Sequence, residues 1–244
     1  MTRQPAMANN VTEFTDAIRL FYRLFYSNEE VAKYNFEKFA ELQQPIARIN
    51  AQPSNDAVKK KTPDEMSGLE PVIFLAKGAH VMLTMNLWTD VGLCNAAAGI
   101  IVDFIYAVNT QPPDLPIAVI LKFDDYAGPS LSNTLPGCVP ICPITITSDI
   151  SEGVHERQQL PVKLAYAITI HKSQGLTLSK AWIDIGKNER TPGITYVAIS
   201  RVRTLSSCII QPMTFERLTS LKRSAGIQFR IREETRLYKL SQNT

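Results

Sequence analysis

A short polar run in the second half of the chain contains the side chains best suited to binding chemistry. It offers an imidazole, a cation, a hydroxyl and an amide, followed by a glycine: His171, Lys172, Ser173, Gln174 and Gly175. A cation can neutralise a phosphate, hydroxyl and amide groups can hydrogen-bond to phosphate or sugar, and an imidazole can stack on a base. The run is therefore a candidate binding site, and from spacing alone a solvated turn is an equally good interpretation.

Arg201 is a second candidate because of its place on an expected helix. Thr191 can cap this helix and Pro192 can take its first position. Apolar residues then recur at helical spacing and define one buried stripe: Ile194, Val197, Ala198, Val202 and Leu205. At about 100° per residue, Arg201 falls within that stripe, whereas Tyr196 and Arg203 point to the opposite side. A guanidinium cannot be discharged there, so it must meet an anion, either a core carboxylate or a phosphate.

The polar run follows a stretch that is typical of a buried strand. Residues 164–170 are mostly apolar and include neither Pro nor Gly, as expected of a strand covered on both faces of a parallel sheet. A further strand is expected at residues 208–210. Ligands of open α/β sheets bind at the carboxyl ends of the strands, which is where the polar run lies. The sequence therefore predicts an α/β domain with a site at this edge.

Two blocks of this region resemble the last two motifs of a helicase family. AITIHKSQGLTL at residues 167–178 and YVAISRVRTL at residues 196–205 are similar to motifs of the petite-integration-frequency DNA helicases, including the copies in Helitron transposons. The resemblance implies a RecA-like motor domain whose first block lies beside single-stranded DNA. It also implies that Arg201 is catalytic and reaches the γ-phosphate of ATP. The implied contacts are DNA binding by His171, Lys172, Ser173 and Gln174, nucleotide binding by Gly175, Tyr196 and Arg201, and no metal ligand.

The N-terminal region resembles the fourth motif of the same family but contains a tandem repeat. AIRLF and SNEEVAKYN match the motif, yet RLFY occurs twice, at residues 19–22 and 23–26. The second copy joins the following turn in the family's register. The four extra residues must therefore loop out, lengthen the strand or displace Ala17 and Ile18. Because of this departure, no nucleotide contact is assigned to Arg19 or Arg23.

A helix and then a linker are expected next. Ser27 and Glu30 form the pattern of a capping box, which predicts a helix that runs to about Leu42. Residues 51–70 have few apolar side chains and several turn formers, so they are expected to be a linker or exposed loop. The lysines at 59–61 could contact a nucleic-acid backbone, but a solvated run is the more common case.

Residues 71–160 change to short β-type runs separated by turn formers. Such runs predict a small barrel, and LAKGAHVMLTMNLWTDVGLCNAAAGII resembles the opening strands of the SH3-like barrel inserted in the family's second motor domain. Ala96 stands where the family more often has glycine, and a positive φ there would cost about 1 kcal/mol. The expected domains are 11–50 and 161–244 for the motor domain, 51–70 for the linker and 71–160 for the barrel.

Composition indicates a globular chain. Its 244 residues are 45% hydrophobic with a net charge of +3, a balance that permits nucleic-acid binding without requiring it. The four scattered cysteines suit an intracellular, reducing compartment, and Cys138 and Cys142 lack a second pair for zinc. No run approaches the ~18 apolar residues of a membrane span. The resemblance implies a nuclear location, with mitochondria as the alternative.

The phosphate loop and magnesium acid of a helicase are not recognised in this sequence. Gly186-Lys187 is followed by Asn188 and lacks the earlier glycine of GxxxxGK, so it is not a Walker loop. Asp184 is interpreted as a turn former at a strand end, and residues 64–65 as solvated. The resemblance begins at about Asp16 and matches only the C-terminal half of the family, so the first motor domain is expected to be missing from these residues.

The expected function is the C-terminal part of an ATP-dependent 5′-to-3′ DNA helicase in DNA repair, recombination and telomere maintenance or in Helitron transposition. The complete enzyme would use ATP and Mg²⁺, neither held by this chain alone. Expected partners are single-stranded DNA or a DNA fork, and a first motor domain in cis or trans, but no membrane. The alternatives are a non-catalytic single-stranded-DNA-binding module, a truncated relic, or a subunit that completes a nucleotide site in trans.

Overall fold

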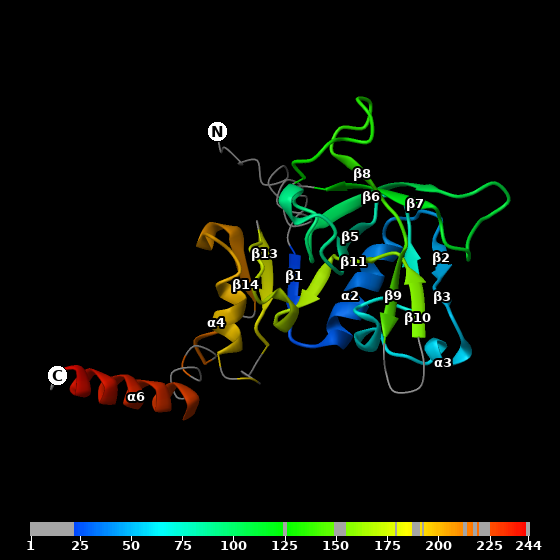
Figure 1. Ribbon diagram of the computed structural model, residues 1–244. Coiled ribbons are helices and arrows are strands. Elements are labelled where there is room, and N and C mark those ends of the chain that lie inside the picture. Colours follow the sequence, from blue (N-terminus) through cyan, green and yellow to red (C-terminus); the bar gives the residue numbers. More distant parts are fainter. Residues whose placement is uncertain are drawn as a thin grey trace, which may run out of the picture. The chain divides into compact units, whose positions relative to one another are not determined.

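The computed structural model contains two compact units, each described here by itself. One consists of the described residues up to Tyr34 together with those from Ala167 onward, and the other of Asn35–Tyr166. Figure 1 labels their helices and strands. The structure describes residues 22–123, 126–148, 155–178, 180–186, 191, 193–211, 214–216, 219 and 225–242.

The first unit is built on a parallel sheet. Its four strands lie in the order β12, β1, β13, β14, and every neighbouring pair is parallel. Leu24 and Ile183, in the two central strands, are fully buried. The expected parallel sheet is thus present, and its carboxyl ends meet at one edge. The strands are β1 (Tyr22–Phe25), β12 (Ala167–Thr169), β13 (Ala181–Asp184) and β14 (Cys208–Gln211).

The second copy of the RLFY repeat supplies strand β1. The arginine of this copy, Arg23, lies opposite Trp182 of β13, with its guanidinium carbon 3.2 Å from the centre of the indole ring and 5.1 Å from that of Tyr34. Arg23 is therefore stacked between aromatic rings within the unit, an arrangement that stabilises a partly buried cation. Ala17, Ile18 and Arg19 lie outside the described residues.

The predicted capping box is confirmed at the start of helix α2 (Asn28–Ala40). The backbone N–H of Glu30 donates to the Ser27 hydroxyl over 3.2 Å, and the N–H of Ser27 donates to the Glu30 carboxylate over 3.1 Å. These reciprocal bonds satisfy two backbone donors that the first turn leaves unpaired. The helix ends at Ala40, two residues before the predicted end.

The single strand predicted at residues 164–170 is wrong in its first half. The structure contains two short strands, β11 (Val162–Leu164) and β12. The first pairs antiparallel with β5 in the second unit, and the other pairs parallel with β1 in the first unit. An apolar run has no periodicity that marks such a change of partner, because both halves are buried.

The second unit is built from antiparallel strands, and the short strands predicted there are confirmed. Five strands form one sheet in the order β11, β5, β6, β7, β8, flanked by the β2–β4 pair and the β3–β10–β9 sheet. Its core includes fully buried Val81, Leu83 and Leu121. The remaining strands are β2 (Ala47–Asn50), β3 (Gln52–Pro53), β4 (Val72–Leu75), β5 (His80–Leu83), β6 (Ala98–Ile105), β7 (Ala118–Phe123), β8 (Cys138–Ile141), β9 (Ile144–Ser148) and β10 (His155–Gln159).

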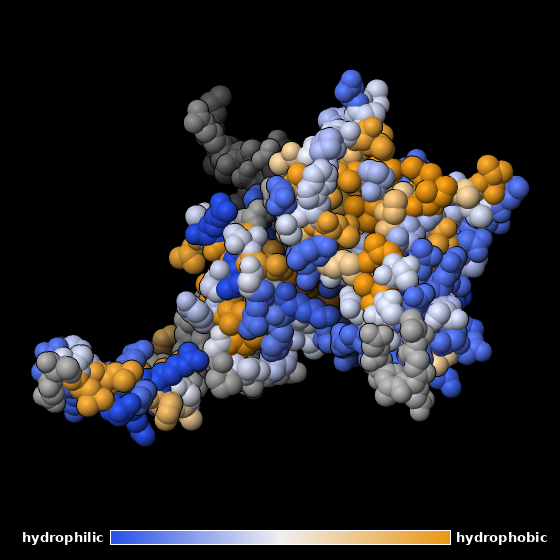
Figure 2. All heavy atoms as spheres, in the orientation of Figure 1, coloured by the Kyte–Doolittle hydropathy of each residue, from blue (hydrophilic) through white to orange (hydrophobic). Residues whose placement is uncertain are grey.

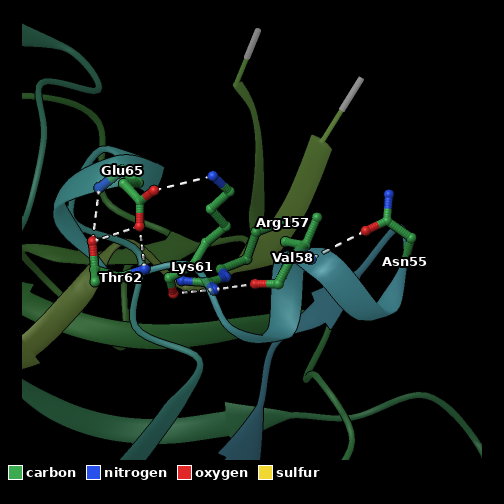
Figure 3. Close-up of polar contacts among 6 residues, drawn as sticks. All are labelled: Asn55, Val58, Lys61, Thr62, Glu65 and Arg157. Atoms are coloured by element: carbon green, nitrogen blue, oxygen red, sulfur yellow. Dashed lines mark hydrogen bonds and ion pairs between the residues drawn. The ribbon is translucent and has the colours of Figure 1, made fainter. Parts of the chain in front are cut away.

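The segment predicted as a linker or exposed loop, residues 51–70, is instead folded onto β10. It contains β3, helix α3 (Asp56–Lys59) and a 3-10 turn, η1 (Asp64–Met66), and it buries Val58, Met66 and Leu69 completely. Figure 3 shows the guanidinium of Arg157 reaching into this segment. The segment has few apolar residues, and hydrogen bonds from the distant Arg157 to its backbone carbonyls help to hold it in place. The prediction failed because these bonds are not visible in the local sequence.

The lysine run on this segment is partly paired with carboxylates. Lys59 lies 2.6 Å from Asp56, and Lys61 lies 3.0 Å from Glu65 (Figure 3). The backbone N–H of Thr62, followed by the Lys61 ammonium, lowers the pKa of Glu65 to about 2. These pairs favour the solvated interpretation of the run over contact with a nucleic acid.

Ala96 has the positive φ that its place in the sequence suggested. Its φ is 68°, a conformation that costs a non-glycine residue about 1–2 kcal/mol in the folded state. Glycine would remove this strain, but its greater freedom in the unfolded chain would lower stability by about 0.4–1 kcal/mol. We therefore expect Ala96→Gly to raise the free energy of unfolding by about 0.5–1 kcal/mol in urea titrations. Gly99→Ala is the contrasting variant, because a Cβ there would lie 2.8 Å from the Lys122 carbonyl oxygen. A loss of stability in Ala96→Gly would contradict the prediction.

The predicted C-terminal helix is present as α6 (Ala225–Ser241). None of its residues is buried, and Figure 2 shows apolar and charged side chains side by side on it. Among the described residues, no helix is both long and apolar enough to cross a bilayer.

Candidate functional site

The polar run forms an ordered turn at the carboxyl end of β12. Its first residues make the 3-10 turn η3 (His171–Ser173). Backbone N–H groups then donate in succession, from Ser173 to Ile170 over 3.2 Å, from Gln174 to His171 over 3.3 Å and from Leu176 to Ser173 over 3.0 Å. The run is thus a defined surface at the edge of the sheet where ligands are expected.

Three of the four expected DNA-binding side chains face solvent. His171, Lys172 and Gln174 are exposed, but Ser173 is fully buried. The Ser173 hydroxyl donates to the carbonyl of Ile170 over 2.7 Å. It holds the turn and does not reach the surface, which corrects the expectation of a direct DNA contact for Ser173.

Gly175 is needed for its backbone conformation. Its φ is +80°, and a Cβ placed there would meet no atom within 4 Å. Space is therefore available for a side chain, but the left-handed conformation disfavours one. The residue is exposed and ends the turn where the chain passes to Leu176.

The helix that leads to Arg201 is shorter than predicted. Helix α4 (Ile194–Ile199) follows Gly193, whose φ is +83°, and Thr191 does not cap it with its side chain. Pro192 lies outside the described residues. The Ser200 hydroxyl donates to the carbonyl of Val197 over 2.9 Å, a local bond that competes with continued helix. Leu205, predicted to be in the buried stripe, is 77% exposed in the 3-10 turn η4 (Leu205–Ser207), because the helix ends before it.

Arg201 lies just beyond α4, and its guanidinium bonds to the turn that holds the residues expected to contact DNA. Its Nη1 donates to the carbonyls of Ser173 and Leu176 over 3.4 and 3.3 Å. Its Nε donates to the Val197 carbonyl and its Nη2 to the Ser200 hydroxyl, each over 2.8 Å. The two sequence blocks are therefore joined through this one side chain.

The positive charge of Arg201 is not neutralised by these contacts. All four acceptors are uncharged, and within the described part of the chain no carboxylate lies at ion-pair distance from the half-buried guanidinium. The core carboxylate considered from the sequence is thus not found there. One N–H of Nη2 also has no acceptor among the described residues. The charge and this donor remain available to an anion.

Of the other two residues expected to contact a nucleotide, Gly175 lies in the turn that Arg201 bonds to, and Tyr196 does not. Gly175 lies between the two carbonyls that accept from Arg201, so these two residues are brought together. A parallel bridge between Leu178 and Val202 also ties the two blocks. Tyr196 is on α4 and is 76% exposed, and no side-chain contact connects it with Arg201 in the described structure.

Sequence reasoning missed Tyr26, the last residue of the second RLFY copy. Its ring centre lies 5.4 Å from that of His171 at an interplanar angle of 69°, and its hydroxyl is 2.9 Å from the Thr191 hydroxyl. The sequence could have indicated this contact. Tyr26 directly follows β1, so it lies at the same edge of the parallel sheet as the polar run that follows β12.

The acid at the end of β13 acts as predicted. A carboxylate oxygen of Asp184 accepts from the backbone N–H of Gly186 over 2.8 Å, as in a turn former. In the described residues, no group of three or more His, Cys, Asp or Glu side chains is close enough to hold a metal ion.

Comparison with known proteins shows that the chain is similar to parts of DNA helicases. No protein-family profile matches it. It is 32% identical over 225 residues to the zebrafish ATP-dependent DNA helicase PIF1, covering 91% of this chain and 32% of that protein. Its fold is similar to that of the Pif1 helicase from Candida albicans, with a TM-score of 0.65, 22% identity, and coverage of 88% of this chain and 49% of that one. Its fold is also similar to that of a Bacteroides Pif1 bound to single-stranded DNA, with a TM-score of 0.62, 22% identity, and coverage of 99% of this chain and 48% of that one.

The similarity is extensive for this chain and partial for its relatives. The chain spans about a third of the zebrafish protein and about half of each solved helicase chain. The solved structures support the RecA-like fold of the parallel sheet. Over most of its length, this chain is therefore homologous to a part of the Pif1 DNA helicases.

Proposed function

We propose that this chain acts as the second motor domain of an ATP-dependent 5′-to-3′ DNA helicase. The observation that carries the proposal is the set of hydrogen bonds from Arg201 to the carbonyls of Ser173 and Leu176. Through these bonds a side chain whose charge no carboxylate of the described residues compensates is joined to an exposed polar turn at the carboxyl edge of a parallel sheet. A motor that couples nucleotide hydrolysis to movement on DNA needs such a connection between its two ligands.

On the nucleotide side, Arg201 is the residue that reaches the γ-phosphate of ATP, with Gly175 and Tyr196 beside the nucleotide. A guanidinium aimed at the transferred phosphoryl group stabilises the charge that develops on it. ATP and Mg²⁺ are held mainly by a first motor domain, supplied in cis or in trans. The 244 residues alone are accordingly expected to hydrolyse no ATP above background, and DNA-stimulated hydrolysis abolished by Arg201→Ala would contradict this.

On the DNA side, the exposed turn with His171, Lys172 and Gln174 contacts a single strand. Lys172 neutralises a phosphate, Gln174 hydrogen-bonds to phosphate or sugar, and His171 stacks on a base. The structural similarity to a Bacteroides Pif1 bound to single-stranded DNA supports this choice of ligand. A DNA fork is the larger substrate that this surface would help to engage.

The second unit is proposed to be an SH3-like barrel inserted in the motor domain, with its core in residues 71–160. Its five-stranded antiparallel sheet supports the proposal. The first unit is assigned to the motor domain. The expected motor-domain segments, 11–50 and 161–244, extend into the second unit, because β2 and β11 pair with β4 and β5 there. The cellular role we propose is DNA repair, recombination and telomere maintenance in the nucleus, with mitochondria as the alternative, or Helitron transposition.

We expect the chain alone to bind single-stranded DNA in the micromolar range or weaker, as is usual for non-specific binding at physiological salt. Lys172→Ala should weaken binding and lower the slope of log K against log salt by about 0.7, the value for one lost phosphate contact on a single strand. Gln174→Ala should weaken binding with little change of slope. Anisotropy titrations of a labelled oligonucleotide at several salt concentrations measure both quantities.

Lys60→Ala is the matched control for this experiment. Lys60 is as exposed as Lys172 but lies on the segment 51–70 in the second unit. If Lys172→Ala and Gln174→Ala leave the affinity for DNA unchanged but Lys60→Ala lowers it, the DNA surface lies on the lysine run at 59–61. The proposed surface would then be wrong.

A non-catalytic single-stranded-DNA-binding module is the second candidate. One observation favours it: the exposed turn and the contacts that order it lie within a single unit, so DNA binding does not require a motor. The two candidates differ when the chain is combined with a first motor domain from a relative. Only the helicase candidate predicts ATP hydrolysis that depends on Arg201.

A further inference from the structure

We propose that Tyr26 positions the imidazole of His171 for stacking on a base of single-stranded DNA. The proposal rests on the function proposed above for the turn, and it assigns a role to a residue for which the sequence indicated none. Tyr26 is not itself expected to touch DNA. Its contribution is to hold an exposed side chain in the orientation that binding requires.

The backbone places Tyr26 and His171 side by side. Tyr26 follows β1 and His171 follows β12 after one residue, and these strands are parallel neighbours with Phe25 opposite Thr169. The backbone N–H of Ile170 donates to the carbonyl of Phe25 over 2.8 Å, which continues the pairing to the edge. The two rings therefore meet at 5.4 Å and 69°, an edge-to-face arrangement that is favourable for aromatic groups.

The hydroxyl of Tyr26 restrains the other end of the ring. It lies 2.9 Å from the Thr191 hydroxyl, and the Thr191 carbonyl accepts from the backbone N–H of Ile194 over 3.1 Å. The tyrosine is thus held by its strand at one end and by the entry to α4 at the other. An exposed imidazole packed on a fixed ring loses less side-chain freedom when a base stacks on it.

These contacts complete a closed chain of interactions within one unit. Tyr26 links the turn to Thr191 and the start of α4, and Arg201, just after α4, bonds back to the carbonyls of Ser173 and Leu176 in the same turn. The turn is therefore supported from two directions. Loss of Tyr26 removes one support and leaves the Arg201 contacts in place.

The first test measures the position of His171 without DNA. In the 244-residue chain, His171→Ala identifies the ring-proton resonances of this histidine among the three in the sequence. We expect Tyr26→Ala to shift these resonances, because the neighbouring ring current is lost, and Tyr26→Phe to keep most of the ring effect. Thr191→Val should leave the ring in place but broaden the resonances. Unchanged resonances in Tyr26→Ala would overturn the proposal.

The second test is a double-mutant cycle on binding of an oligothymidine strand. Tyr26→Ala should weaken binding about 2- to 10-fold, the range expected for one aromatic contact. It should have no further effect in the His171→Ala background. Tyr238→Ala on α6, where the tyrosine is 67% exposed, is the matched control and should leave affinity unchanged.

The outcomes separate this proposal from the proposed function. If His171→Ala and Lys172→Ala weaken binding but Tyr26→Ala does not, the turn binds DNA and the role of Tyr26 is wrong. Equal weakening by Tyr26→Ala in both backgrounds also overturns it, because Tyr26 would then act elsewhere. If neither His171→Ala nor Lys172→Ala affects binding, both proposals are wrong. Circular dichroism of each variant shows that the fold is retained.

Discussion

Arg201→Ala is expected to reduce ATP turnover about a thousandfold or more when the chain is joined to a first motor domain from a relative. The guanidinium is oriented by uncharged acceptors, which position it without neutralising it. The proposed function requires this charge to stabilise the phosphoryl group in the transition state. Steady-state hydrolysis in the presence of single-stranded DNA measures the effect.

The neighbouring Arg203→Ala is the matched control, because Arg203 is exposed and follows the same helix. It should change turnover by a small factor only. DNA binding by Arg201→Ala should stay near that of the parent, since the backbone bonds of the turn remain. Arg201→Lys keeps a charge but cannot reproduce the forked set of donors, so turnover should stay low. Turnover of Arg201→Ala within a few-fold of the parent would show that the residue only holds the turn.

Arg157→Met is expected to have the largest effect on stability, lowering the free energy of unfolding by about 3 kcal/mol or more. Arg157 is only 1% exposed, and its guanidinium donates to three backbone carbonyls, those of Leu69, Val58 and Lys61, over 2.8, 2.6 and 2.8 Å. Methionine fills a similar volume but removes the donor of the Leu69 and Lys61 carbonyls, whereas the Val58 carbonyl keeps the backbone N–H of Lys61 at 3.1 Å. Burial lowers the pKa of Arg157, whereas the negative charges of Glu70 and Glu65 raise it. Burying the charged guanidinium is therefore unfavourable by itself, and the three hydrogen bonds to carbonyls offset that cost.

Urea unfolding measures the loss, and hydrogen exchange shows where it falls. Amides of residues 56–70 should exchange faster in Arg157→Met than in the parent, because the arginine holds this segment on β10. Arg232→Met, at an exposed arginine of α6, should change stability by less than about 0.5 kcal/mol. Unchanged exchange in residues 56–70 would contradict the assigned role of Arg157.

Local signals allowed many elements to be predicted. The reciprocal pattern of Ser27 and Glu30 acts within one helical turn, so the start of α2 could be identified from four residues. The run of apolar residues before His171 likewise located the end of a parallel strand and the polar turn after it. The possibility of a positive φ at Ala96 came from the resemblance, in which glycine is more common at this position, and the structure has a φ of 68° there.

The helix before Arg201 shows where periodicity alone misleads. The spacing of apolar residues continued through Leu205, but the helix ends at Ile199. Its end is decided by the side chains of Ser200 and Arg201, which bond to the carbonyl of Val197. The inference that Arg201 needs an anion stays a prediction, since its acceptors among the described residues are uncharged and include two carbonyls of a turn distant in sequence.

The segment 51–70 was mispredicted for a related reason. Strand β10 turns polar residues inward, with His155, Arg157 and Gln159 all buried. An inward polar face is unfavourable unless each group finds a partner. The partners of Arg157 and Gln159 are carbonyls about 90 to 110 residues away along the chain, and that of His155 is the side-chain amide of Asn55. No local pattern contains that information.

The sequence by itself predicted several strands of the second unit, the polar turn and the capping box, because each depends on residue types at short, regular spacing. Tertiary structure alone decided that Ser173 is buried, that Tyr26 packs on His171, and that uncharged carbonyls orient Arg201. These contacts join residues 26, 171 and 201, which are far apart in the chain. They form only because parallel pairing of β1 with β12, and the return of the chain after α4, bring the three to one edge of the sheet.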